Sequence, residues 1–269
     1  RNRVEVYSPD DDYYRSQRAQ FLSVSEITRA LHEGRMLLYH QRITPLRDPL
    51  RKHAEILVRM LDSRGELILP GVFIPAAERF NVMPQIDRWV IDKVCALVGA
   101  EGAERDTDTV FAVNLSGNTL SKDDLAHYVA QCFAQHQADP TRICFEITET
   151  AAIGSLDRAQ NFIDRMHSLD ATVALDDFGA GLSSFAYLRR LSADFLKIDA
   201  LFVRKLDSDL RDRAVVRSIM EVARVHGMRT IAEFVHTPEI LAILREMGID
   251  YAQGFALHKP EPLPQRRAS

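Results

Sequence analysis

Short apolar and β-branched runs alternate along the chain with longer stretches in which apolar residues recur at helical spacing. The short runs predict strands at residues 37–41, 54–59, 110–114, 143–147, 172–175, 195–198, 229–232 and 251–254. The helical spacing predicts helices at residues 23–35, 85–97, 122–137, 156–169, 185–191, 211–226 and 238–247. Eight strands that mostly alternate with helices predict an α/β fold, a TIM-like (β/α)8 barrel of mainly parallel strands.

An open, doubly wound sheet is the structural alternative. Such a sheet would carry a GxGxxG turn after its first strand and would gather its polar residues at one switch point. No GxGxxG turn follows the first predicted strand, and polar residues recur at the ends of nearly all the strands. The barrel therefore explains the pattern better.

The chain divides into one large domain and two short ends. A length of 269 residues with 46% hydrophobic residues suits a single α/β barrel, which we place at residues 23–264, with a tail at 265–269. Residues 1–7 alternate like a strand and a charged stretch follows, so residues 1–22 are interpreted as the remnant and linker of an upstream domain.

The overall charge and the cysteine pattern narrow the classes of partner. A net charge of −4 with scattered basic residues argues against a nucleic-acid polymer as partner. The three cysteines lack CxxC spacing and lie in apolar or helical surroundings, which indicates reduced core thiols, a cytoplasmic location and no structural zinc site. No apolar run is long enough to span a bilayer, so we expect no membrane contact by this domain itself.

Polar side chains stand at the carboxyl ends of most predicted strands. In a barrel these ends open on one face, so residues far apart in sequence converge there. Oxygen ligands suit Mg²⁺ or Mn²⁺, whereas zinc would favour His and Cys, and no His pair with ligand spacing lies near these strand ends. Each residue alone could be an ordinary surface or capping group. The set comprises Glu55, Arg59, Asn114, Glu146, Glu149, Asp176, Asp177, Lys197, Asp199, Glu233 and Gln253.

The adjacent carboxylates Asp176 and Asp177 end one apolar run and precede Gly179. Alone, this pair is typical of a turn or a helix cap. Like charges at such short range raise each other's pKa, and a divalent cation removes that cost. A carboxylate shared between two cations is a usual arrangement in phosphoester displacement.

The ordered motifs of the chain resemble the EAL-type cyclic di-GMP phosphodiesterase domain. They are EILVR from Glu55, VNLS around Asn114, EITET from Glu146, DDFGAG from Asp176, LKID ending at Asp199, IAEFV around Glu233 and YAQGF around Gln253. The resemblance implies a barrel with one strand near the start antiparallel to the others. The first seven residues resemble the last strand of a diguanylate cyclase (GGDEF) domain. This implies upstream GGDEF and sensory domains, and a full-length protein that could be anchored to the inner membrane through them.

The resemblance also implies roles for individual residues. It places one divalent cation on Glu55, Asn114, Glu146 and Asp176, and a second on Asp176, Asp177 and Glu233. It implies that Lys197 and Glu233 orient the attacking water and that Glu149 anchors the loop holding the Asp pair; with Glu55 these form the catalytic set. It implies substrate contacts from Gln41, Leu57, Arg59, Asp199 and Gln253, and hydrolysis of cyclic di-GMP to linear 5′-pGpG.

Two departures from the family pattern bear on activity. Ile56 replaces the usual Ala and should affect packing only, whereas His236 stands where the family usually has a second Glu, which would weaken the support of the metal ligands. The alternative function is a weak or inactive cyclic di-GMP receptor that signals by conformation. A metal-dependent lyase or aldolase is a remote third reading, and a homodimer through the face near the DDFGAG loop would be typical of the family.

Overall fold

The computed structural model describes residues 24–47, 50–100, 108–122, 124–179 and 185–263. Its strands are β1 (Met36–Pro45), β2 (His53–Leu61), β3 (Leu67–Ile68), β4 (Val110–Leu115), β5 (Ile143–Thr148), β6 (Thr172–Phe178), β7 (Phe195–Ile198), β8 (Arg229–Ala232), β9 (Tyr251–Ala252) and β10 (Glu261–Pro262). The predicted strand at residues 1–7 and the tail at 265–269 lie outside the described residues.

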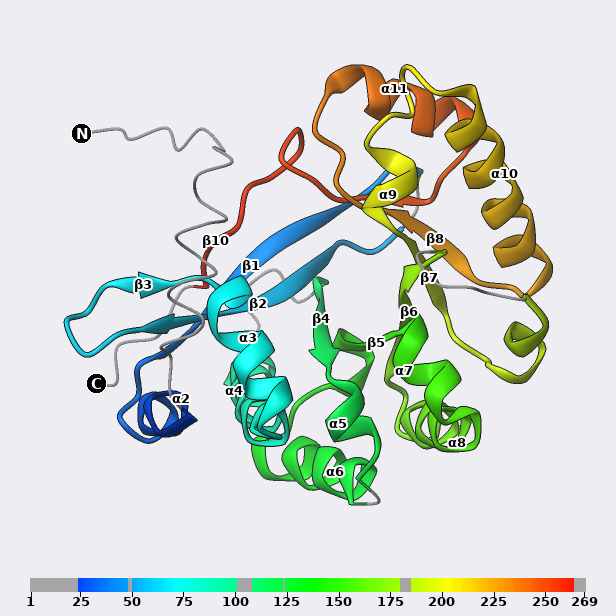
Figure 1. The fold of residues 1–269 in the computed structure, drawn as a ribbon. Helices are drawn as coiled ribbons and strands as arrows, with labels where there is room; N and C mark the ends of the chain where they lie inside the picture. Colours follow the sequence, from blue (N-terminus) through cyan, green and yellow to red (C-terminus); the bar gives the residue numbers. More distant parts are fainter. Residues whose placement is uncertain (1–23, 48–49, 101–107, 123, 180–184, 264–269) are drawn as a thin grey trace.

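Helices pack around the outside of the strands (Figure 1). They are α2 (Val24–His32), α3 (Pro70–Arg79), α4 (Met83–Ala100), α5 (Gly117–Leu120), α6 (Leu125–His136), α7 (Glu149–Gly154), α8 (Leu156–His167), α9 (Ala200–Val203), α10 (Leu210–Val225) and α11 (Pro238–Met247), with 3-10 turns η1 (Pro140–Arg142) and η2 (Phe185–Arg190). No described helix combines the length and apolar character needed to cross a bilayer.

Eight strands close into the predicted barrel. From β2 through β4, β5, β6, β7, β8 to β9 all neighbours are parallel, and β1 closes the ring by pairing antiparallel with both β2 and β9. The prediction of one antiparallel strand near the start is therefore confirmed. Two short strands lie outside the ring: β3 pairs with β2, and β10 pairs with β1.

Several predicted elements need correction in type or extent. The stretch 185–191 forms a 3-10 helix at Phe185–Arg190 rather than an α-helix, and β9 ends at Ala252, two residues early. Helix α3 was not predicted, because Pro70, Gly71 and Pro75 lie within it; Pro70 stands at its first turn, where a missing N–H costs nothing. The short helices α5, α7 and α9 were also missed, because each directly follows a strand end.

The barrel interior is filled by an apolar layer that sets the floor of the site. It is built from one or two inward residues of seven of the eight barrel strands, among them Ile43, Ala112, Phe195 and Tyr251. The eighth strand, β2, contributes His53, whose ring centroid lies 5.0 Å from that of Phe195 and 5.1 Å from that of Tyr251. Burial lowers the pKa of His53 to about 4, so this imidazole is neutral at pH 7.

The polar residues of the strand ends form the next layer above this floor. Side chains two residues apart on a strand share a face. Glu146 therefore stands above Cys144, Lys197 above Phe195 and Gln253 above Tyr251. On β1 the order is reversed, with Gln41 preceding Ile43, because this strand runs the other way.

Candidate active site

Lys197 on β7 is the electrostatic centre of the polar layer. Its side chain is completely buried, and its ammonium nitrogen lies 2.7 Å from Glu146 Oε2, 3.0 Å from Asp176 Oδ1 and 2.8 Å from Glu233 Oε1. These carboxylates come from β5, β6 and the residue after β8, so four strands meet at one cation. Burial opposes the charge of Lys197, but the carboxylates raise its pKa well above the usual value, so it remains an ammonium.

One cation does not compensate all the buried carboxylates. Burial raises the pKa of Glu146 well above its ordinary value and that of Glu233 to about 8, and the neighbouring acids add to this against the opposing charge of Lys197. A cluster of this kind holds extra protons unless further positive charge is bound.

A second group of polar side chains adjoins the first. Glu55 on β2 accepts hydrogen bonds from Asn114 Nδ2 at 2.7 Å and from Gln253 Nε2 at 2.5 Å. The Gln253 amide also donates to Gln41 Oε1 at 3.1 Å, and Gln41 donates to the His258 carbonyl at 2.9 Å. The first and last strands of the barrel are thus tied to β2 through Glu55.

The two adjacent aspartates adopt different conformations at an irregularity of β6. The pairing of β6 with β7 shifts register between Leu175 and Phe178, and Asp177 has a left-handed backbone with φ of 55°. Asp176 is buried while Asp177 is exposed to solvent. Although Asp177 is open to solvent on one side, its carboxyl group is partly withdrawn from water, and this loss of hydration, followed by the neighbouring charge of Asp176, raises its pKa to about 6.

This donor set fits a divalent cation. Oxygen atoms of Asp176, Asp177 and Glu233 lie within 4.8 Å of one another. Glu146 Oε1 is buried and has no hydrogen-bond partner among the described residues, although its other oxygen is paired with Lys197. An unpartnered buried carboxylate oxygen beside other carboxylate and amide oxygens is what a hard cation such as Mg²⁺ requires.

Glu149 links the end of β6 to the 3-10 turn η2. This buried carboxylate, at the start of α7, accepts hydrogen bonds from Gly179 N at 2.9 Å and from Tyr187 Oη at 2.6 Å. Gly179 lies two residues after Asp177, so the contact fixes the backbone beyond the Asp pair.

A cavity of about 250 Å³ opens over the cluster. Sequence reasoning missed Phe234 and Phe255, whose exposed rings (44% and 62%) form part of its wall. Gly254 also lines it, and a Cβ there would lie 2.1 Å from Val235 O, so only glycine permits this close approach. The full lining is Gln41, Glu55, Ala200, Glu233, Phe234, His236, Gln253, Gly254 and Phe255.

Three predicted substrate contacts are not among the residues that line this cavity, although Asp199 adjoins Asp177. Arg59 lies over the Tyr39 ring at 5.2 Å and donates to Val58 O, while the half-buried Leu57 precedes it on β2. Asp199 caps α9 by accepting from Leu201 N at 2.6 Å. Gln41 and Gln253 do line the cavity.

The two departures in the motifs occupy different environments. Ile56 is buried in the core between barrel and helices, on the opposite face of β2 from Glu55. His236 is exposed at the cavity wall, where its Nδ1 lies 3.2 Å from the Phe234 carbonyl oxygen. No contact between His236 and a candidate metal ligand is found among the described residues.

The fold and this site define a class: a TIM-like barrel with a carboxylate-rich pocket at the carboxyl ends of its strands, whose oxygen atoms could hold a metal ion. The chain belongs to the EAL domain family, whose family model matches residues 24–260.

Named relatives and solved structures agree with this assignment. The chain is 38% identical to the cyclic di-GMP phosphodiesterase PdeB of Shewanella oneidensis, covering 97% of this chain and 31% of that protein. It is 35% identical to the cyclic di-GMP phosphodiesterase PdeF of Escherichia coli, covering 89% of this chain and 32% of that protein. The chain thus spans about a third of the length of these curated relatives.

Two solved structures share the fold. The PaMucR phosphodiesterase in complex with c-di-GMP superimposes with a TM-score of 0.83 at 30% identity, covering 89% of this chain and 97% of that one. The FimX EAL domain from Pseudomonas aeruginosa bound to c-di-GMP gives a TM-score of 0.82 at 26% identity, covering 88% and 95%.

Proposed function

We propose that this domain is a metal-dependent phosphodiesterase that hydrolyses cyclic di-GMP to linear 5′-pGpG. The observation that carries the proposal is the buried Lys197 with three carboxylates at 2.7–3.0 Å, beside the Glu55–Asn114 pair, in a chain of the EAL family. The named relatives supply the substrate class.

Two divalent cations, Mg²⁺ or Mn²⁺, would be held by the oxygen atoms of the cluster. Glu55, Asn114, Glu146 and Asp176 would hold one, and Asp176, Asp177 and Glu233 the other. When bound, they would supply positive charge against the phosphate and would acidify a water molecule.

The remaining chemistry belongs to side chains of this chain. An ammonium group has three donors, and each donor of Lys197 faces a carboxylate here. One of these contacts must open before Lys197 can orient a water molecule, with Glu233 positioned to accept its proton. Glu149 would keep the Asp pair in place through Gly179.

Substrate contacts are assigned to two sides of the site. Gln41 and Gln253 face the cavity directly. Arg59, with its positive charge on the same face of β2 as Glu55, would bind the nucleotide, together with Leu57 and Asp199.

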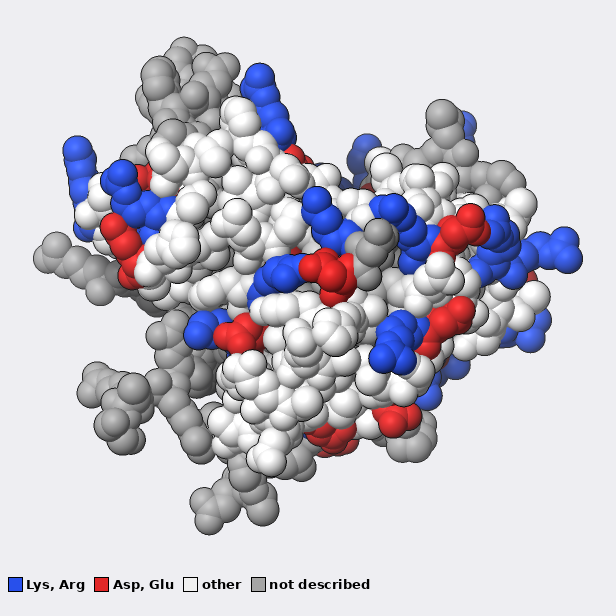
Figure 2. Space-filling model, turned by 90° about the horizontal axis from the view of Figure 1, so that it is seen from below, with Lys and Arg blue, Asp and Glu red and all other residues white. Residues whose placement is uncertain are grey.

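The partner of the domain is thus the dinucleotide, not a nucleic-acid polymer. On the face seen in Figure 2, many basic side chains lie beside acidic ones.

The test is the conversion of cyclic di-GMP by the purified chain with Mg²⁺, Mn²⁺ or EDTA, with nucleotides separated by chromatography. We expect pGpG to form only with metal, to be lost in Glu55→Ala, and to persist in Glu66→Ala, which removes an exposed carboxylate on the β2–β3 connection. Binding of intact cyclic di-GMP without product would refute hydrolysis and support the receptor function. It would also point to His236 as the disabling change.

The wider context is a proposal of the same kind. We propose that the domain works in the cytoplasm downstream of GGDEF and sensory domains, because the named relatives are about three times as long as the matched region. A homodimer would form through the face near the DDFGAG loop, of which residues 180–184 lie outside the described part of the chain.

A further inference from the structure

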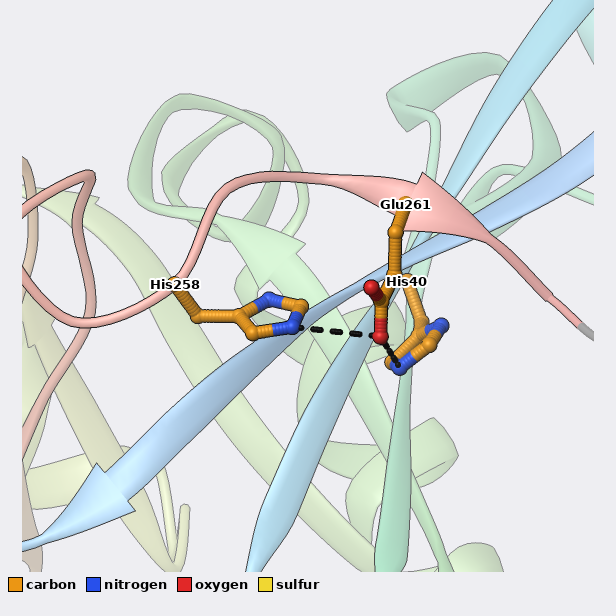
Figure 3. A group of neighbouring side chains, drawn as sticks. All are labelled: His40, His258 and Glu261. Carbon is orange, nitrogen blue, oxygen red and sulfur yellow. Dashed lines mark ion pairs between the residues drawn. The ribbon is translucent and has the colours of Figure 1, made fainter.

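A second group of metal-ligating side chains lies on the outer face of the barrel, away from the carboxylate cluster. His40 on β1 stands directly opposite Glu261 on β10 in the antiparallel pairing, and His258 approaches from the loop before β10 (Figure 3). Glu261 Oε1 lies 3.3 Å from His40 Nε2 and 3.2 Å from His258 Nε2. All three ligand atoms lie within 4.8 Å of one another.

We propose that His40, His258 and Glu261 form a binding site for a transition-metal ion, Zn²⁺ in particular, that joins the segment after β9 to β1. Two imidazoles and one carboxylate are a ligand set that zinc uses, with water at a fourth position. The site is distinct from the cluster around Lys197, whose ligands are all oxygen atoms.

The spacing of the ligand atoms carries the proposal. Zinc binds imidazole nitrogen and carboxylate oxygen at about 2.0–2.2 Å, and the edge of a tetrahedron with such bonds is about 3.3–3.6 Å. The two separations from Glu261 Oε1, 3.2 Å and 3.3 Å, lie within about 0.1 Å of the short end of that range. Two of the three ligand separations therefore already suit a tetrahedral ion, and the third, between the two imidazole nitrogens, lies within 4.8 Å.

Burial and charge are also compatible with a cation. The His40 and His258 side chains are 16% and 12% exposed, whereas Glu261 is 50% exposed and gives the site a route to solvent. Burial lowers the pKa of His40, which leaves its ring neutral at pH 7. Arg42 Nη2 lies 3.9 Å from Glu261 Oε1, but its side chain is 66% exposed and can turn away.

The metal-free arrangement has an alternative explanation in hydrogen bonding alone. Arg42 N donates to His258 Nδ1 at 3.3 Å, which puts the proton of the neutral ring on Nε2, facing Glu261. For a metal to bind at Nε2, that proton must move to Nδ1, and the hydrogen bond from Arg42 N must then be given up. His40 Nδ1 is buried without a hydrogen-bond partner among the described residues. In neither ring, therefore, does Nδ1 donate a hydrogen bond to an acceptor, the contact that usually orients a metal-binding imidazole. Missing support of this kind weakens a metal site by about 10- to 100-fold, so we expect moderate affinity.

The experiment titrates ZnCl2 into the zinc-free chain by calorimetry in the presence of excess Mg²⁺, which would compete with zinc for the oxygen ligands around Lys197. We expect one zinc equivalent in the wild type and at least about tenfold weaker binding in His258→Gln and in Glu261→Gln. His127→Gln, which removes an exposed imidazole on α6, is the matched control and should bind zinc like the wild type.

A spectroscopic measurement keeps the test decisive if a variant folds poorly. X-ray absorption at the zinc edge of the loaded wild-type chain should show two imidazole ligands in a four-coordinate site. Oxygen-only coordination would overturn the proposal, as would zinc binding in a folded His258→Gln variant that equals the wild type in stoichiometry and affinity.

Discussion

Replacing Lys197 by Met should destabilise the metal-free protein far more than the metal-loaded protein. Met has similar length but no charge, so the variant leaves Glu146, Asp176 and Glu233 buried without their common cation. The ammonium is 1% exposed, and its three partners are 1%, 11% and 19% exposed. Removing one partner of a buried ion pair costs about 3–5 kcal/mol, and we expect a loss of this size at pH 7 in EDTA.

Bound divalent cations should reduce that loss. With the carboxylates engaged by metal, the variant lacks mainly a buried hydrogen-bond donor, and the expected cost falls to about 1–3 kcal/mol. The assay is urea unfolding of wild type and Lys197→Met, each with EDTA and with saturating Mg²⁺. Lys93→Met, which removes a half-exposed ammonium on α4, is the control and should cost less than about 1 kcal/mol.

The result that would refute this reasoning is a loss of equal size with and without Mg²⁺. Such a result would mean that Lys197 stabilises the barrel by packing alone. It would also mean that the carboxylates around it do not bind the cation.

Three further predictions concern residues near the site and in the core. The three cysteine thiols are buried, and burial raises the pKa of Cys95 to about 12. An aromatic disulfide reagent should therefore label none of the three thiols in the folded chain and all three in denaturant. Rapid labelling of the folded chain would contradict this prediction. Asp87→Ala on α4 removes a buried carboxylate that accepts hydrogen bonds from Ser116 N at 3.0 Å and Thr119 Oγ1 at 2.5 Å, just after Asn114. We expect the free energy of unfolding in urea to fall by about 2–4 kcal/mol and Mg²⁺ to bind more weakly. No change in either quantity would refute this prediction. Asp177→Gly relieves a left-handed backbone conformation that costs an L-residue about 1–2 kcal/mol. The melting temperature of the variant in EDTA should therefore not fall below that of the wild type, while hydrolysis is lost. A clear drop in melting temperature would show that the carboxylate stabilises the fold.

Strand periodicity predicted most of the fold because the interior of the barrel imposes a simple rule. Phe195 and Lys197 are two residues apart, as are Tyr251 and Gln253, so one strand face carries both the apolar floor and the polar site. The direction of β1 is not recorded in such a pattern, since alternation reads the same both ways. Only the family resemblance supplied it.

The short helices and the metal-ligating group on the outer face depend on contacts that the linear pattern does not show. Glu149 begins α7, yet the sequence presents it only as a polar residue after a strand. His40 and His258 are far apart in the chain and meet because β10 pairs with β1. Local spacing therefore gave no reason to expect imidazoles at one place.

The antiparallel β1 has a consequence for how the protein is made. Among the described strands of this domain it is synthesised first, but its partners on one side, β9 and β10, are synthesised last, with Thr44 pairing with Ala252 and Tyr39 with Pro262. Until those residues leave the ribosome, one edge of β1 has unpaired backbone groups, and such an edge favours association with other chains. Ring closure in this domain is thus a late, long-range step, and a nascent chain stalled before β9 should be prone to aggregation.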